Sequence, residues 1–245
     1  MVLYFIHRFQ IALTYYVYMC RFLIYVDDLG QRMPSSLEAF QRSMLVPNEN
    51  HDSGFLQALH EHLTDMYKLY DPMPANFITL SAMDFVNGCI LEEMPTIRNM
   101  PLSKSAHSWP YYLRNKTGTA TAYSFMLFPK TSHCEMSVYI QAIEDMSFVI
   151  NLINDVISYV FFLVVCRKFI NKNEFYRFYK ETIAGETKNY IHNRAHVTGR
   201  SISDTLQDTV DDVLAANARI MKIFESTDAL TPWKRFINGY LYVSL

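Results

Sequence analysis

Glycine and proline are scarce in this chain, and that scarcity limits the folds that it can adopt. Its 245 residues include only 7 Gly and 9 Pro, while 50% are hydrophobic and 15% are aromatic. Sandwiches and barrels need frequent turn residues, so this composition disfavours them. Long apolar runs with few breakers favour an all-α protein, and the length is sufficient for one large domain with its own core.

Cysteine and net charge are also low. The four cysteines are widely spaced and form no CxxC pair, which is typical of reduced, buried thiols in an intracellular protein. A formal net charge of −2 gives no electrostatic reason to expect nucleic acid or an acidic membrane surface as a partner. We therefore predict a cytoplasmic helical enzyme or scaffold that binds no nucleic acid and has no stable membrane partner.

The amino-terminal stretch 1–26 is rich in aromatic and aliphatic residues and needs its own interpretation. His7, Arg8 and Arg21 interrupt it, and the uninterrupted part is shorter than the roughly 20 residues of a spanning helix. It also lacks the basic start and the small-residue cleavage site of a signal peptide. A buried core helix is the preferred interpretation, and a membrane segment is the alternative.

Apolar periodicity, caps and breakers predict the order of the helices. Polar loops are expected at 46–54 and 94–108, and Gly88 in the middle of a helix indicates either close helix packing or a ligand. His192 and His196 have the spacing of a zinc pair, but the acidic residue of a zinc hydrolase is missing between them. The predicted helices are 9–29, 35–45, 55–70, 75–93, 109–128, 135–158, 203–225 and 231–245.

Two short charged groups interrupt apolar surroundings. Asp27 and Asp28 follow an apolar run, where adjacent carboxylates are costly to bury unless they bind cations. The alternative is an ordinary solvated helix end. Arg114 and Lys116 lie beside another apolar stretch, where they either receive an anionic group or simply face solvent.

The stretch 154–181 contains what resembles an interrupted metal motif. Asn154 and Ser158 are four residues apart and share a helix face. A third ligand is expected at position 162, but Phe162 cannot bind a metal. If residues 159–177 are removed, Glu181 falls eight residues after Asn154 on that same face. An amide oxygen, a hydroxyl and a carboxylate in this order form a half-cage suited to Mg²⁺.

Together these segments resemble the trichodiene synthase family, the fungal class I sesquiterpene synthases. The resemblance implies an all-α class I terpenoid synthase helical bundle, with two metal motifs facing each other across a central active-site cavity. It also implies that residues 1–245 form a single α-domain, interrupted by the insert at 159–177. The segments that carry it are YVDD (25–28), MDFVNGCILEE (83–93), WPYYLRNKTG (109–118), NDVIS with FYKE (154–158 and 178–181), AGETKNYIHNRA (184–195) and FINGYLYVSL (236–245).

The resemblance also implies a role for each matching residue. The substrate is farnesyl diphosphate, held through three Mg²⁺ ions, and its ionisation is followed by 1,6-closure through nerolidyl diphosphate to a trichodiene-like or cuprenene-like hydrocarbon. A catalytically inactive helical remnant is the alternative, and a homodimer is the assembly that the family suggests. The implied metal ligands are Asp27, Asp28, Asn154, Ser158 and Glu181; the implied diphosphate ligands are Arg114 and Lys180; and Asp27, Arg114 and Lys180 are the catalytic residues.

The chain departs from the family pattern in three ways. Gln31 stands where the aspartate-rich motif usually has a further acid. Family chains begin well before the aspartate pair and continue to an Arg-Tyr pair, so we expect this sequence to be truncated at both ends. Codons for 158–160 can contain the splice signal GTATGT, and codons for 175–177 can end in the matching acceptor. We therefore interpret 159–177 as a retained intron translated in frame.

Overall fold

The computed structural model describes residues 2–29, 32–46, 53–169 and 189–244, with side chains described for 14–28, 32–46, 53–157 and 189–241. All regular secondary structure in these ranges is helical, which confirms the predicted all-α class. The elements are α1 (Val2–Leu29), α2 (Pro34–Leu45), α3 (Gly54–Leu69), α4 (Pro72–Glu93), α5 (Pro95–Arg98), α6 (Trp109–Thr117), α7 (Ala120–Met126), η2 (Lys130–Ser132), α8 (Met136–Tyr139), η3 (Ile140–Ala142), α9 (Ile143–Phe169), α11 (Tyr190–Thr198), α12 (Ile202–Ile223) and α13 (Leu230–Ser244).

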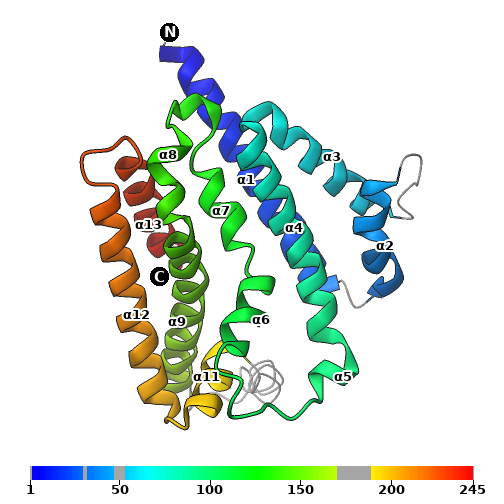
Figure 1. Ribbon diagram of the computed structural model, residues 1–245, viewed down its shortest axis with the longest axis vertical. Helices are drawn as coiled ribbons and strands as arrows, with labels where there is room; N and C mark the ends of the chain where they lie inside the picture. The colour runs from blue at the N-terminus through cyan, green and yellow to red at the C-terminus, as the bar shows by residue number, and fades with distance from the viewer. Residues whose placement is uncertain (1, 30–31, 47–52, 170–188, 245) are drawn as a thin grey trace.

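The helices form two groups with α6 and α7 between them (Figure 1). On one side α1 packs along α4, with α2 and α3 outside them, and on the other α9 packs along α12. Because α7 contacts both α4 and α9, the two groups share one continuous core. Apolar side chains from both groups are buried there, including Met19, Leu59, Ile78, Phe125, Val149 and Ile220.

The predicted single helix over 109–128 is wrong, because the chain breaks between α6 and α7. Thr119 adopts a left-handed conformation with φ 50° and ψ 15°, which a β-branched residue rarely takes. α6 therefore ends at Thr117, and α7 begins as a separate helix at Ala120. This break places the last turn of α6, which carries Arg114, against α9.

Other helix boundaries also differ from the predictions. α4 begins at Pro72 rather than at residue 75, because proline is tolerated in the first turn of a helix. The loop predicted over 94–108 contains the single turn of α5. The helix predicted over 135–158 is divided into α8, η3 and α9, and α9 continues past residue 158 to Phe169.

Gly88 is explained by close packing between α4 and α6. A Cβ atom at this position would lie 2.7 Å from the backbone oxygen of Lys116, so α6 approaches too closely for any side chain here. Beside it, the Lys116 Nζ donates to Asp84 Oδ2 at 2.6 Å. The charge of Lys116 is therefore paired with α4, and Arg114 is the inward-facing cation of α6.

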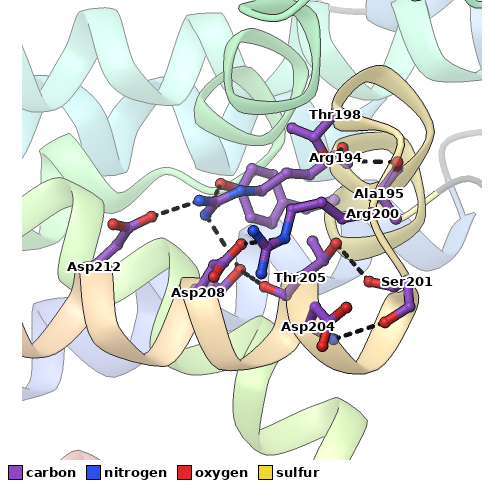
Figure 2. A network of polar contacts seen from close by, with 11 residues as sticks. Arg194, Ala195, Thr198, Arg200, Ser201, Asp204, Thr205, Asp208 and Asp212 are labelled. Carbon is purple, nitrogen blue, oxygen red and sulfur yellow. Dashed lines mark hydrogen bonds and ion pairs between the residues drawn. The ribbon is translucent and has the colours of Figure 1, made fainter.

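A polar network joins α11 to α12 across their short connection (Figure 2). Gly199 has a φ of 68°, which reverses the chain, and the Ser201 hydroxyl accepts the Asp204 amide at 3.1 Å to cap α12. Two ion pairs follow on the facing sides, Arg194 to Asp212 at 2.7 Å and Arg200 to Asp208 at 2.9 Å.

The two histidines of α11 have partners within the protein. A ring nitrogen of His192 lies 2.8 Å from the Asn189 side-chain oxygen, and the Nε2 of His196 lies 2.9 Å from the backbone oxygen of Leu102. These contacts give each ring a structural role. The zinc alternative gains no support from them.

One stretch of the described chain, Met136–Ile157, is long and apolar enough to cross a membrane by composition. Half of that apolar window is buried inside the helical bundle, as expected of a core helix. The α9 residues Asn151, Asn154 and Asp155 lie within this stretch.

His62 should make the folding stability depend on pH. Its ring stacks on Tyr15 at 5.1 Å and lies 5.3 Å from the Phe22 ring, and burial lowers its pKa from 6.5 to about 4. Between pH 6.5 and pH 4 the unfolded chain binds a proton on His62 that the folded protein does not bind. The folding stability should therefore fall as the pH falls from 6.5 towards 4. We expect this effect to reach on the order of 2–3 kcal/mol.

Urea unfolding of the wild type and His62→Phe at a series of pH values measures this contribution. The wild type should lose stability relative to His62→Phe across that window, whereas replacement of the exposed His107 by Gln should leave the profile unchanged. Parallel profiles for the wild type and His62→Phe would contradict the prediction.

Candidate functional site

The aspartate pair lies at the carboxyl end of α1, where the helix dipole already concentrates negative charge. The Cys89 thiol lies 4.0 Å from Asp27 Oδ1, on the α4 side. Partial burial raises the pKa of Asp27, with further increases from Asp28 and Glu93, while the Arg114 charge lowers it. Negative charge therefore accumulates at this end of α1, and a cation would relieve it.

A small cavity of about 190 Å³ opens beside Asp27. This volume is below the roughly 300–1,000 Å³ typical of small-molecule pockets, so this cavity alone does not enclose a farnesyl chain. Its walls come from the ends of α1, α2 and α4 and from α5, and include Val26, Asp27, Leu37, Glu38, Cys89 and Glu93.

Arg114 is held against α9 by three hydrogen bonds. Its Nε donates to both carboxylate oxygens of Asp155, at 2.9 and 2.8 Å, and its Nη2 donates to the backbone oxygen of Asn151 at 3.1 Å. The two side chains are only 14% and 21% exposed. Burial raises the pKa of the Asp155 carboxyl, and the Arg114 charge opposes that increase.

Gly118, at the end of α6, allows this arrangement. A Cβ atom there would lie 1.8 Å from Asn151 Oδ1 and 2.6 Å from Arg114 Nη1. Asn151 is 1% exposed, and its Oδ1 accepts no hydrogen bond within the described part of the chain. The α6–α7 break is therefore packed so closely on Asn151 and Arg114 that only glycine fits.

The second metal motif is only partly within the described residues. Asn154 is exposed on α9, and Ser158 lies one turn further along the same helix, although its side chain is outside the description. Residues 159–169 prolong α9, whereas Lys180 and Glu181 lie outside the described residues. Gln31 also lies outside them. In the ranges that the structure does describe, no group of three or more His, Cys, Asp or Glu is placed to hold a metal ion.

Tyrosine side chains cluster between α1 and α7. The rings of Tyr16 and Tyr123 lie 5.1 Å apart, and burial raises the pKa of both phenols. Tyr240, from α13, is influenced by the charges of both Arg114 and Asp155 and also raises the pKa of Tyr16. These three tyrosines come from α1, α7 and α13, and the charges of the Arg114–Asp155 pair shift the pKa of one of them, Tyr240.

Sequence reasoning identified Arg114 but missed Asp155, Asn151 and the tyrosine cluster. The sequence did carry a signal for a buried role of Asp155. It is the only acidic residue between Asp145 and Glu174, in a stretch where apolar residues predominate. An isolated carboxylate in such a helix needs a buried cation as partner. Asn151 had the weaker signal of a polar residue one turn before it.

Comparison with known proteins identifies the family of this chain. Residues 8–245 match the model of the trichodiene synthase family, which is nearly the whole chain. The chain belongs to the trichodiene synthase family. This confirms the resemblance carried by the aspartate pair, the WPYYLRNKTG segment and the NDVIS motif.

Similar members of the family come from several fungi. Terpene synthase BipA of Cochliobolus sativus is 31% identical over 242 residues, covering 96% of this chain and 67% of that protein. Monoterpene synthase 25 of Postia placenta is 32% identical over 223 residues, covering 90% and 60%. Longiborneol synthase CLM1 of Gibberella zeae is 29% identical over 208 residues, covering 84% and 56%. The chain thus spans about two thirds or less of the length of these relatives.

Proposed function

We propose that this member of the trichodiene synthase family is a sesquiterpene synthase that acts on farnesyl diphosphate. The C1–O bond of the substrate breaks, its electron pair leaves with diphosphate, and the farnesyl cation cyclises before a proton is lost to give a hydrocarbon. The observation that carries this proposal is the partly buried Arg114. It is bound by Asp155 of α9, and its positive charge lowers the pKa of Asp27. A buried, oriented cation beside an acidic helix end suits the departure of an anionic leaving group.

The donor set of the site fits Mg²⁺. Carboxylates and amide and hydroxyl oxygens are the ligands that this ion prefers, and burial, followed by the charges of Asp28 and Glu93, raises the pKa of the Asp27 carboxyl. Asp27 and Asp28 would hold metal on one side, and Asn154, Ser158 and Glu181 on the other. When bound, Mg²⁺ supplies positive charge that stabilises the departing diphosphate.

The side chains around the charged pair would protect the carbocation. Arg114 and, by family resemblance, Lys180 bind the diphosphate and keep it at the polar end of the site. The tyrosine rings on α1, α7 and α13 offer π-faces that stabilise a cation and exclude water. We expect 1,6-closure through nerolidyl diphosphate, giving a trichodiene-like or cuprenene-like product.

Incubation of the purified chain with Mg²⁺ and farnesyl diphosphate, followed by analysis of the extracted hydrocarbons, tests this function. Geranyl diphosphate should be offered in parallel, because one relative is named a monoterpene synthase. A cyclic hydrocarbon from farnesyl diphosphate that disappears when Mg²⁺ is chelated supports the proposal. Products from geranyl diphosphate alone would reassign the substrate.

The alternative is that the chain is an inactive helical remnant, and a specific observation favours it. α9 continues as a helix through residues 159–169. In the family pattern, the residues that match Lys180 and Glu181 would instead follow Ser158 within about one helical turn. An absence of any Mg²⁺-dependent product would favour the remnant. A cytoplasmic location and a homodimer stay predictions, which cell fractionation and light scattering of the purified chain would test.

A further inference from the structure

The contact between Arg114 and Asp155 uses only one edge of the guanidinium group. Arginine carries five N–H donors. Asp155 accepts from Nε, and the Asn151 backbone oxygen accepts one hydrogen from Nη2. Within the described residues, the two N–H groups of Nη1 and one of Nη2 have no such partner. The guanidinium is therefore anchored along one side and offers donors along the other.

The room around the free edge depends on Gly118. A Cβ atom at Gly118 would lie 2.6 Å from Nη1, so the glycine leaves room for this nitrogen that a larger residue would take. Asp155 instead contacts Nε, from α9, which packs against α6. The side chain of Arg114 is therefore fixed through Nε and one hydrogen of Nη2, while 14% of it stays exposed.

We propose that Asp155 is a positioning residue, which orients Arg114 so that its free edge binds the diphosphate of the substrate. This inference rests on the proposed function for its ligand. An arginine side chain has several rotatable bonds and loses rotamer entropy when it is immobilised. Because Asp155 restricts that motion before the substrate arrives, less entropy is lost on binding.

The sign of the effect separates positioning from simple electrostatics. Asp155 is a negative charge next to a site for an anion, so removing that charge should strengthen diphosphate binding if only Coulomb forces act. If positioning dominates, the same change should weaken binding by about tenfold, because Arg114 must then be ordered by the ligand itself.

Calorimetric titration with inorganic diphosphate, with and without Mg²⁺, measures this effect on the full chain. Asp155→Asn should bind about tenfold more weakly than the wild type. Asp145→Asn is the matched control, because Asp145 is on the same helix and pairs with the exposed Arg219 at the surface. It should leave the affinity unchanged.

A double-mutant cycle shows whether Asp155 acts through Arg114. In an Arg114→Met background, Asp155→Asn should have no further effect on diphosphate affinity, because there is no guanidinium left to position. A role of Asp155 in general stability would weaken binding in both backgrounds. Should Asp155→Asn fail to fold, Asp155→Glu keeps the charge but moves the carboxylate, and it should also weaken binding.

The outcomes of this experiment separate the inference from the function on which it rests. Unchanged or tighter binding by Asp155→Asn, or no diphosphate binding by the wild type, would overturn the positioning role. Weaker binding by Asp155→Asn in a chain that forms no hydrocarbon would reject the synthase function and leave the positioning role intact. In an active chain, Asp155→Asn should also lower kcat, since Arg114 acts on the leaving group.

Discussion

Gly118→Ala is expected to lower turnover of farnesyl diphosphate by at least about a hundredfold, because an error of about 1 Å in a positioned group can cost that much. The added Cβ would lie 1.8 Å from Asn151 Oδ1 and 2.6 Å from Arg114 Nη1. Neither neighbour can withdraw easily, since Asn151 is buried and Arg114 is held by Asp155. The clash must therefore move Arg114, or α6 away from α9.

The same substitution should reduce the free energy of unfolding by about 1–3 kcal/mol, which is the usual cost of overpacking a core. Gly54→Ala is the control, because Gly54 begins α3 and a Cβ there would meet no atom within 4 Å. Steady-state kinetics, diphosphate titration and urea unfolding of both variants give the comparison. Turnover and affinity equal to the wild type in Gly118→Ala would show that Arg114 is not held as described.

Removal of residues 159–177 is expected to raise the activity of the chain by at least about a hundredfold, because loss of a charge-stabilising group commonly costs that factor. α9 continues through residues 159–169, and eleven helical residues carry the chain about 16 Å beyond Ser158. The deletion instead places Lys180 and Glu181 within the next turn, on the face of Asn154 and Ser158.

A substitution variant separates the motif from the length of the insert. Phe161→Lys with Phe162→Glu, made in the intact chain, restores lysine and glutamate at the positions that the deletion would give them. If the split motif limits activity, both variants should form more product than the unaltered chain. Equal activity in all three chains would contradict the split-motif hypothesis.

Transcripts give an independent test of where the insert comes from. Messages that lack the codons for 159–177 would support a retained intron, since removal of those codons rejoins Ser158 to Phe178. If every message retains these codons, the intron hypothesis is wrong. The insert would then be a genuine part of the protein, and the deletion experiment would report only on its effect.

Most helices could be predicted from the sequence because their signals are local. α2 and α3 match their predicted ranges to within one residue, since each has a clear apolar periodicity and a start signal. The α6–α7 break could not be predicted in this way. Nothing local requires Thr119 to adopt its left-handed conformation, which lies where α7 begins to pack between α4 and α9.

The sequence by itself determined the family, the all-α class and the identity of Arg114 as a candidate diphosphate ligand. These depend on residue types and on spacings along the chain, which are visible without coordinates. Only the tertiary structure decided that Asp155 holds Arg114 and that Gly118 leaves no side chain to clash with the guanidinium. Asp155 and Arg114 are 41 residues apart in the chain, and no local pattern encodes a contact between two helices brought together by a shared core.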